Sequence, residues 1–226
     1  LSLRRQRQMC IRDSDNFPFM GVIETVLKDK IPCRIARISF SGELAYEVYT
    51  PSDYGPAAMD LLWGVSEPIG GCLYGLEALG AMRIEKGHVT GAELDGRVTI
   101  EDAGLGRMAS SKKSYIGSAL RKRPELVRED RPRLVGIYPI NRHETFNAGA
   151  ILCAANAVQG FGDGWISGVT HSPELGHWIG LGFIAGGLEA WQGRSVVAAD
   201  PVRKSDVAVE IVSPHMVDPD GERLYG

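Results

Sequence analysis

Five short apolar runs in the second half of the chain constrain its fold more than any other feature. Each run is rich in aliphatic residues, and turns that contain Gly or Pro separate the runs at fairly even spacing. This pattern is typical of β-strands that form a small barrel or a sandwich. We therefore expect a β-barrel domain over residues 134–226, with strands at 134–140, 150–158, 178–186, 195–199 and 207–214.

The first half of the chain begins with strand patterns. An apolar run over 31–40 ends at a Ser41-Gly42 turn, after which residues 44–51 alternate between polar and apolar with a period of two. The two runs predict a β-hairpin or a bend between two strands.

Helical patterns come after the strands. Residues 51–53 offer an N-cap for a helix whose apolar residues over 57–63 recur at helical spacing. A second helix is predicted over 76–86, and Gly87 is expected to end it.

The segment 121–133, RKRPELVREDRPR, is rich in charge and proline and is net basic. Such a composition is typical of a solvated linker. The predicted fold class is therefore α+β, in which residues 15–120 form one domain, 121–133 connect it to the next, and 134–226 form the barrel.

Composition narrows the possible classes of function. The 226 residues carry a formal net charge of −3, which argues against nucleic acid as a partner. The sequence contains no run of about 18 apolar residues, so we expect no membrane span. The four cysteines lack C-x-x-C spacing, which fits a reducing compartment. We expect a cytoplasmic protein that holds no metal of its own.

Residues 1–14, LSLRRQRQMCIRDS, do not match the rest of the chain in character. They are basic, lack periodicity and start with Leu rather than Met. They form either an unstructured basic arm or foreign sequence that fold reasoning should exclude. We expect foreign or disordered sequence here, and a chain that is truncated at its N-terminus.

Several chemical motifs are absent from the sequence. The glycine-rich stretch 164–187 has no phosphate-binding pattern, so its glycines are expected at turns and barrel corners. His171 and His177 lie six residues apart with Pro173 between them, which is not the spacing of a helical metal site. Ser41 lacks the G-x-S-x-G context of an activated nucleophile.

Two charged positions keep a functional and a structural interpretation open. Glu47 shares one strand face with Glu43 and Tyr49. It is either an exposed polar residue or a carboxylate that accepts two hydrogen bonds from an aminopyrimidine. Arg83 belongs to a helix of alternating charge. It either forms part of a salt-bridged helix face or is a cation that faces a ligand. Residue spacing alone does not decide between these interpretations.

Several blocks of sequence resemble the folate-binding aminomethyltransferase family, which includes the glycine-cleavage T-protein. RISFSGELAYEVYTP resembles its signature R-x-[GS]-[YF]-x-G-E-x-x-x-E-[IV], and YGLEALGAMRIEKGHVTGAELDGRVTIEDAGLGRM resembles the next block. Within the family, the C-terminal part of the alpha subunit of heterotetrameric sarcosine oxidase is most similar to three short sequences: RIEKGH, LGHWIGLG and SPHMVDPDGERL. The resemblance covers about residues 15–226.

The resemblance implies a fold and a chemistry. Residues 15–120 would be part of the T-protein-like folate-binding domain, truncated at its N-terminus and followed by the small barrel. The oxidoreductase to which it belongs would pass the one-carbon unit of oxidised sarcosine to tetrahydrofolate. Its partners would be the beta, gamma and delta subunits. FAD, FMN and NAD belong to that complex and are not expected within this chain.

The resemblance also assigns residues. Glu47 falls on the family glutamate that hydrogen-bonds the pterin ring, and Phe40 falls where relatives have a folate-contacting Tyr, so only stacking is expected there. Arg83 is the third candidate for folate contact. Leu79 replaces a folate-contacting Arg of the glycine-cleavage enzymes, which favours the sarcosine oxidase branch. The catalytic Asp of the family lies upstream of this sequence, so no catalytic residue is assigned and this chain alone is expected to be inactive.

Other functions remain open from the sequence. The alternatives are that the chain is part of a glycine-cleavage-type aminomethyltransferase, of a dimethylglycine or sarcosine dehydrogenase-like enzyme, or of a non-catalytic folate-binding scaffold.

Overall fold

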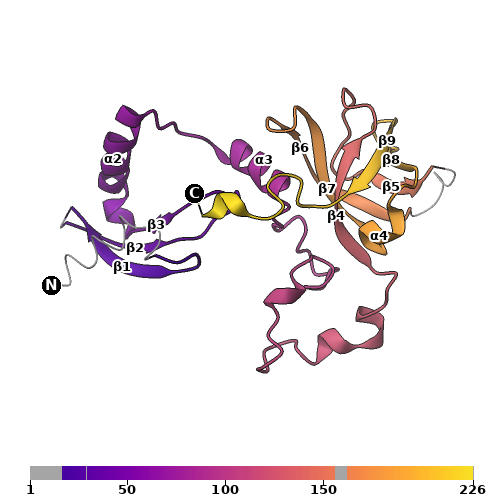
Figure 1. Cartoon of the computed structure of the whole chain (residues 1–226), viewed down its shortest axis with the longest axis horizontal. Coiled ribbons are helices and arrows are strands. Elements are labelled where there is room, and N and C mark those ends of the chain that lie inside the picture. Colours follow the sequence, from indigo (N-terminus) through magenta and orange to yellow (C-terminus); the bar gives the residue numbers. More distant parts are fainter. Residues whose placement is uncertain (1–16, 29, 156–161, 226) are drawn as a thin grey trace. The chain divides into compact units, whose positions relative to one another are not determined.

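The computed structural model describes residues 17–28, 30–155 and 162–225, which form two compact units (Figure 1). The first unit contains the described residues up to Leu79 and those from Asp220 onwards. The second unit spans Gly80–Pro219. The segment 1–14, which we expected to be foreign or disordered, lies outside the described residues.

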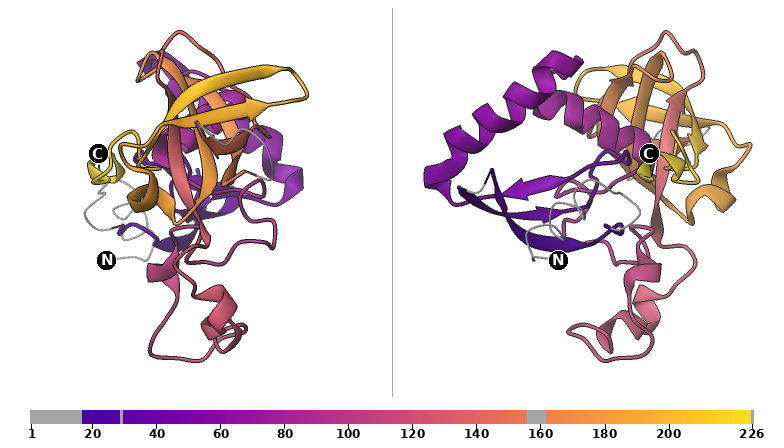
Figure 2. Two further views of the ribbon diagram at one scale, coloured as in Figure 1. Left: turned by 90° about the vertical axis from the view of Figure 1, so that its right-hand side faces the viewer. Right: turned by 60° about the vertical axis from the view of Figure 1, so that its left-hand side comes forward.

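A closed antiparallel β-barrel forms the centre of the second unit (Figure 2). Its strands run in the order β4-β7-β6-β5-β8-β9, and pairing between β4 and β9 closes the barrel. The barrel predicted from the apolar runs is thus confirmed. Its strands are β4 (Pro132–Pro139), β5 (Ile151–Ala154), β6 (Gly164–Ser172), β7 (His177–Ala185), β8 (Val196–Asp200) and β9 (Ser205–Val212).

We predicted that the glycines in 164–187 lie at turns and barrel corners. This prediction was wrong for most of that stretch, because it forms β6 and β7. The interior of the barrel has no room for side chains at these positions. A Cβ atom on Gly182 would lie 2.5 Å from the carbonyl oxygen of Trp165, and one on Gly180 would lie 2.8 Å from the ring of Phe146. Glycine is needed at these strand positions because other atoms of the protein approach its backbone closely.

The barrel core is fully apolar at its centre. Val135, Leu152 and Val209 are completely buried, and a short helix α4 (Gly187–Trp191) packs against β4, β7 and β9. The indole N–H of Trp191 donates a 2.8 Å hydrogen bond to the carbonyl of Ala185, which satisfies the polar atom of this buried ring.

The segment 121–133, predicted as a solvated linker, lies within the second unit. Two 3-10 turns, Leu120–Lys122 and Pro124–Leu126, precede the start of β4. The side chain of Arg131 is 17% exposed and forms an ion pair with Asp102, which is 4% exposed. Most of the segment is exposed, as expected for a solvated stretch, and this pairing attaches Arg131 near its end to the second unit.

A three-stranded antiparallel sheet occupies the described part of the first unit, in the order β1 (Val22–Leu27), β2 (Ile31–Ala36), β3 (Glu47–Tyr49). Cys33 and Ile35 of β2 point inward and pack with Phe17. The predicted hairpin is confirmed as β2–β3. Its first strand ends before Phe40, however, and residues 37–46 form a long connection. Strand β1 was not predicted from the sequence.

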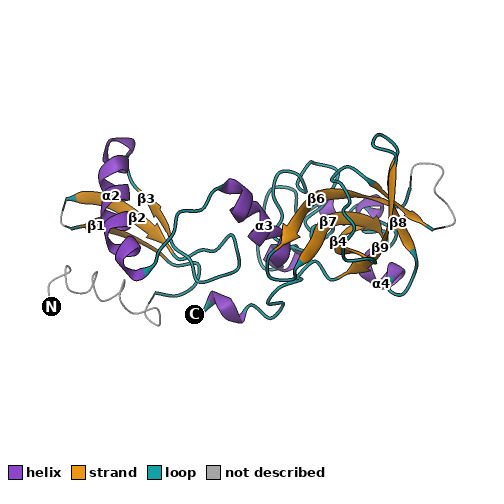
Figure 3. Ribbon diagram, turned by 90° about the horizontal axis from the view of Figure 1, so that it is seen from above, coloured by secondary structure: helices purple, strands orange, loops and turns teal. Residues whose placement is uncertain are grey.

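Two helices come after the sheet. Figures 1 and 3 show α2 (Gly55–Ser66) over one face of the sheet. The expected N-cap at 51–53 was wrong, because a 3-10 turn occupies Ser52–Tyr54 and no side chain caps the helix. The second helix, α3 (Leu76–Lys86), has the predicted bounds.

The C-terminus of α3 is a Schellman motif. The N–H groups of Gly87 and His88 donate to the carbonyls of Ile84 and Arg83 at 3.1 and 2.9 Å. Gly87 has a φ of 77°, so it ends the helix as predicted.

Within the described residues, none of the helices combines the length and the apolar character needed to cross a lipid bilayer.

Candidate functional site

Glu47 lies on the exposed face of β3, beside Tyr49. The hydroxyl of Tyr49 donates a hydrogen bond to Oε2 of Glu47, while Val48 between them packs toward the core of the sheet. Because the Glu47 carboxylate accepts this hydrogen bond and carries negative charge, it raises the pKa of Tyr49. The contact holds the carboxylate in one orientation. Residue spacing had placed both side chains on one face but had not paired them.

Phe40 lies in the connection between β2 and β3. Its side chain is 39% exposed. The N–H of Gly42 donates to Oγ of Ser39 at 2.9 Å, and the φ of 87° at Gly42 turns the chain. Phe40 therefore stands next to a tight turn rather than inside a strand.

Glu43, the other carboxylate of this stretch, has a different partner. Its Oε1 lies 3.3 Å from a guanidinium nitrogen of Arg223, and both side chains are exposed by more than two fifths. Glu43 and Glu47 were equivalent by spacing, and the structure gives the first an ion pair at the turn and the second a tyrosine on the strand.

Arg37, at the start of the family-like signature, is buried and anchors two distant parts of the first unit. Its Nη1 donates to the carbonyl of Phe17 at 2.7 Å, and its Nη2 lies 3.4 Å from the carbonyl oxygen of Leu224. The Arg of the signature therefore has a structural role here, which was not predicted from the sequence.

Arg83 lies in the second unit, in an almost fully buried ion pair. Its Nη1 is 3.1 Å from Oε2 of Glu93 and 3.1 Å from the carbonyl oxygen of His88. The side chains of Arg83 and Glu93 are 11% and 0% exposed. Arg83 thus forms a salt bridge, but with a residue ten positions away rather than with a neighbour on its own helix.

The Glu93 carboxylate is saturated with hydrogen bonds. Its Oε2 also accepts the N–H of Thr90 at 2.7 Å, and its Oε1 accepts the hydroxyl of Ser167 at 2.7 Å. Ser167 sits where the register of β6 and β7 shifts between Ile166 and Gly168. Such a bulge redirects one side chain out of the alternation, and here it points Ser167 at Glu93.

The candidate residues therefore belong to different units. Glu47 and Phe40 lie in the first unit, whereas Arg83 lies in the second. Among the described residues, no group of three or more His, Cys, Asp or Glu side chains is arranged to hold a metal ion. His171 contacts the ring of Trp178 and His177 contacts that of Tyr138.

A domain match and a structural likeness show which known proteins the chain resembles. Residues 7–113 match the GCVT N-terminal domain, a match that begins inside the segment expected to be foreign. The structure superposes on the glycine cleavage system aminomethyltransferase T from Bartonella henselae with a TM-score of 0.70. That likeness covers 93% of this chain and 57% of that one, at 23% sequence identity. The chain therefore has the GcvT-like aminomethyltransferase fold, which confirms the expected fold class, and residues 7–113 are similar to the GCVT N-terminal domain.

Individual relatives show which proteins the chain resembles over most of its length. The chain is 34% identical over 213 residues, 92% of its length, to the sarcosine oxidase subunit alpha of Rhizobium meliloti. It is 34% identical over 218 residues to the same subunit of a Corynebacterium species, strain U-96. The chain spans only 22% of each of these proteins. An aminomethyltransferase of Streptomyces coelicolor is 27% identical over 68% of this chain and 41% of its own length.

Proposed function

We propose that this chain is the tetrahydrofolate-binding part of a sarcosine oxidase alpha subunit. In that role it accepts the one-carbon unit of oxidised sarcosine onto tetrahydrofolate, in a complex with beta, gamma and delta subunits that holds FAD, FMN and NAD. The 34% identity to two alpha subunits over more than nine tenths of the chain supports this proposal.

The single observation that carries the folate assignment is the geometry of Glu47. The carboxylate is exposed on β3 and one of its oxygens accepts the hydroxyl of Tyr49. An ionised carboxylate has about four acceptor positions, so it can still receive two N–H groups from an aminopyrimidine ring. Such charge-assisted, paired hydrogen bonds fix the plane of the ring as well as its position. Phe40, partly exposed and nearby in sequence, offers an aromatic face for stacking.

The contribution of such a site to catalysis is positioning. Holding the pterin presents the nitrogens of the folate to the incoming one-carbon unit in a fixed geometry. Positioning of this kind is worth on the order of 7–11 kcal/mol in ideal intramolecular reactions. No side chain is assigned as the proton acceptor or donor of the reaction.

Calorimetric titration of tetrahydrofolate into the chain and into Glu47→Gln tests the assignment. Replacing the carboxylate removes charge-assisted hydrogen bonds of about 1.5–3 kcal/mol, so we expect the affinity to fall by about tenfold or more. Glu43→Gln is the matched control, because Glu43 has its own partner in Arg223, and it should bind like wild type. Equal affinity of wild type and Glu47→Gln would refute Glu47 as the pterin anchor.

A glycine-cleavage-type aminomethyltransferase is the second candidate, favoured by the fold likeness to the T-protein of Bartonella henselae. The two candidates differ in the donor of the one-carbon unit. The full-length protein, purified with its partner subunits, should form methylenetetrahydrofolate from sarcosine. Formation only from an aminomethylated carrier protein would favour the second candidate.

A further inference from the structure

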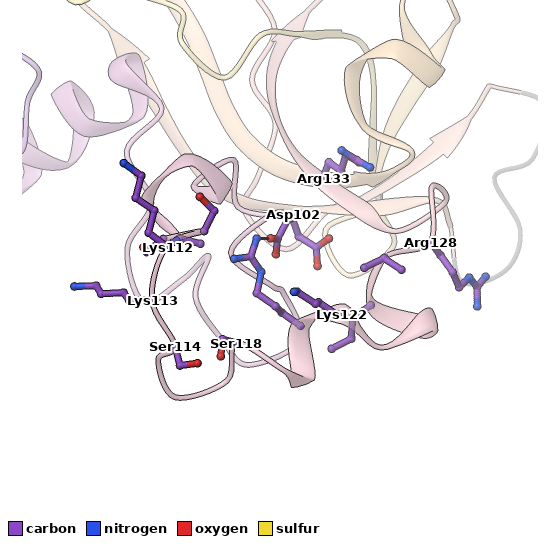
Figure 4. Close-up of a pocket in the computed structure, with 15 residues that line it drawn as sticks. Asp102, Lys112, Lys113, Ser114, Ser118, Lys122, Arg128 and Arg133 are labelled. Atoms are coloured by element: carbon purple, nitrogen blue, oxygen red, sulfur yellow. Dashed lines mark hydrogen bonds and ion pairs between the residues drawn. The ribbon is translucent and has the colours of Figure 1, made fainter.

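A basic basin lies in the second unit, formed by the loops that lead into the barrel (Figure 4). Its volume is about 660 Å³, within the usual size of a small-molecule pocket. We use the name basic basin for the cavity lined by the cationic side chains of Lys112, Lys113, Arg121, Lys122, Arg128 and Arg133.

The acidic groups of the basin are already neutralised. Glu101 forms an ion pair with Arg121, and Asp102 forms one with Arg131, which lies outside the lining. Arg128 is likewise paired, with Glu125 and Asp130.

Four cations of the basin remain without such pairing. In the described ranges, ion pairs are absent for the side chains of Lys112, Lys113, Lys122 and Arg133. Figure 4 shows Lys122 between Lys112 and Lys113 on one side and Arg128 on the other. In a chain whose net charge is −3, this local excess of positive charge does not follow from composition.

The lining of the basin indicates the chemistry of its ligand. Small-molecule pockets are mostly apolar, whereas this one adds four serines to its charged residues: Ser110, Ser111, Ser114 and Ser118. An apolar ligand would desolvate these groups without compensation. Hydroxyl and ammonium donors instead suit oxygen-rich anions, and the flexible, exposed lysines can adjust to them.

We propose that the basic basin binds a small-molecule anion that carries two or more phosphate or carboxylate groups. In Figure 4 the ammonium ends of Lys112 and Lys113 point away from Lys122. These flexible side chains would turn inward for a ligand with several charges to contact more than one of the unpaired cations at once. The proposal does not depend on the folate assignment, since neither Glu47 nor Phe40 lines the basin.

Calorimetric titration of the full chain with tripolyphosphate and, separately, with a triglutamate peptide tests the proposal. The charge-removing variant is Lys112→Gln combined with Lys122→Gln. Its matched control is Lys30→Gln combined with Lys204→Gln, which removes the same charge at exposed lysines outside the basin. Lys112→Arg with Lys122→Arg keeps the charge. Thermal unfolding of every variant establishes that it is folded.

We expect at least one probe to bind wild type, the control and the arginine variant alike, and to bind the basin variant about tenfold more weakly or less. Binding should weaken when NaCl is raised from about 50 to about 200 mM. Binding of tripolyphosphate alone identifies phosphate as the ligand chemistry, and binding of triglutamate alone identifies carboxylate. Two results would overturn the proposal: neither probe binds wild type at millimolar concentration, or the basin variant and its control lose the same affinity.

Discussion

At the scale of single residues, the pairing of Tyr49 with Glu47 makes a direct prediction about titration. The hydrogen bond requires a protonated phenol, so the pKa of Tyr49 lies above the ordinary value of 10.0. The stabilisation that it provides is therefore present below about pH 10 and is lost as the pH rises through the raised pKa. Glu47→Gln should move the Tyr49 titration back toward 10.

The ultraviolet absorbance of tyrosinate, followed against pH in wild type, Glu47→Gln and Tyr49→Phe, measures this effect. The Tyr49→Phe variant identifies which component of the titration belongs to this residue. A Tyr49 component that titrates at the same pH in wild type and in Glu47→Gln would contradict the pairing.

The buried ion pair of Arg83 and Glu93 predicts a large effect on stability. Glu93→Ala leaves the buried Arg83 without its carboxylate, although the carbonyl of His88 remains, and leaves the N–H of Thr90 without its acceptor. Breaking a buried pair from one side costs about 3–5 kcal/mol in the free energy of unfolding, measurable by urea denaturation. The exposed carboxylate of Glu125, which pairs with Arg128, provides the control.

Glu125→Ala should cost less than about 1 kcal/mol, because exposed ion pairs contribute little. If Glu93→Ala is no more destabilising than Glu125→Ala, the buried pair does not contribute to stability as its burial suggests. The same pair argues against Arg83 as a ligand contact, because an Arg that turned to a ligand would leave the buried Glu93 carboxylate without its cation.

At the scale of elements, the end of α3 offers a test in which two glycines should respond in opposite directions. Gly87 has a φ of 77°, and a Cβ atom there would lie 2.5 Å from the carbonyl oxygen of Pro214. Gly87→Ala should therefore destabilise the protein by more than the roughly 1–2 kcal/mol that left-handed backbone alone costs. Gly80 lies within the same helix, with nothing within 4 Å of such a Cβ atom.

Gly80→Ala should stabilise the protein by about 0.5–1 kcal/mol, because alanine loses less backbone entropy in a helix. Thermal unfolding of both variants measures the difference. A destabilisation by Gly80→Ala equal to that by Gly87→Ala would show that the two positions do not differ as their backbone geometry predicts.

How much of the fold could be predicted depended on which physical signal each element carries. Runs rich in aliphatic residues, such as 134–140 and 207–214, indicated strands because short apolar runs bounded by turns are typical of strands in a barrel. Strand β6, which contains Ser167 and His171, carries no such run, and its glycines were taken for turns. The need for glycine there arises from the close packing of neighbouring strands, which local sequence does not reveal.

The site was predictable to a similar extent. Resemblance to a family singled out Glu47, and the period of two already placed Tyr49 on the same face, so this pair was within reach of the sequence. The partner of Arg83 was not, because Glu93 is brought to it only after the helix has ended and the chain has turned back.

At the scale of the whole molecule, the two units should differ in resistance to hydrogen exchange. The barrel pairs β4 with both β7 and β9, so its described strands leave no free edge, whereas β1 and β3 are the edges of the described three-stranded sheet. Amides of β4 and β7 should exchange more slowly than those of β1 and β3 when monitored by mass spectrometry. Equal protection of the two units would contradict this expectation.

The guanidinium of Arg37 has a consequence for how this chain can be re-engineered. It binds the carbonyls of Phe17 and Leu224, so the first and last parts of the described chain meet at one side chain. Two segments that lie this close together can be joined by a short linker, and new ends can then be opened at an exposed turn. Joining residue 224 to residue 17 through a short glycine-serine linker, and opening new ends at the exposed turn 201–204 between β8 and β9, should give a permuted protein that still forms both units.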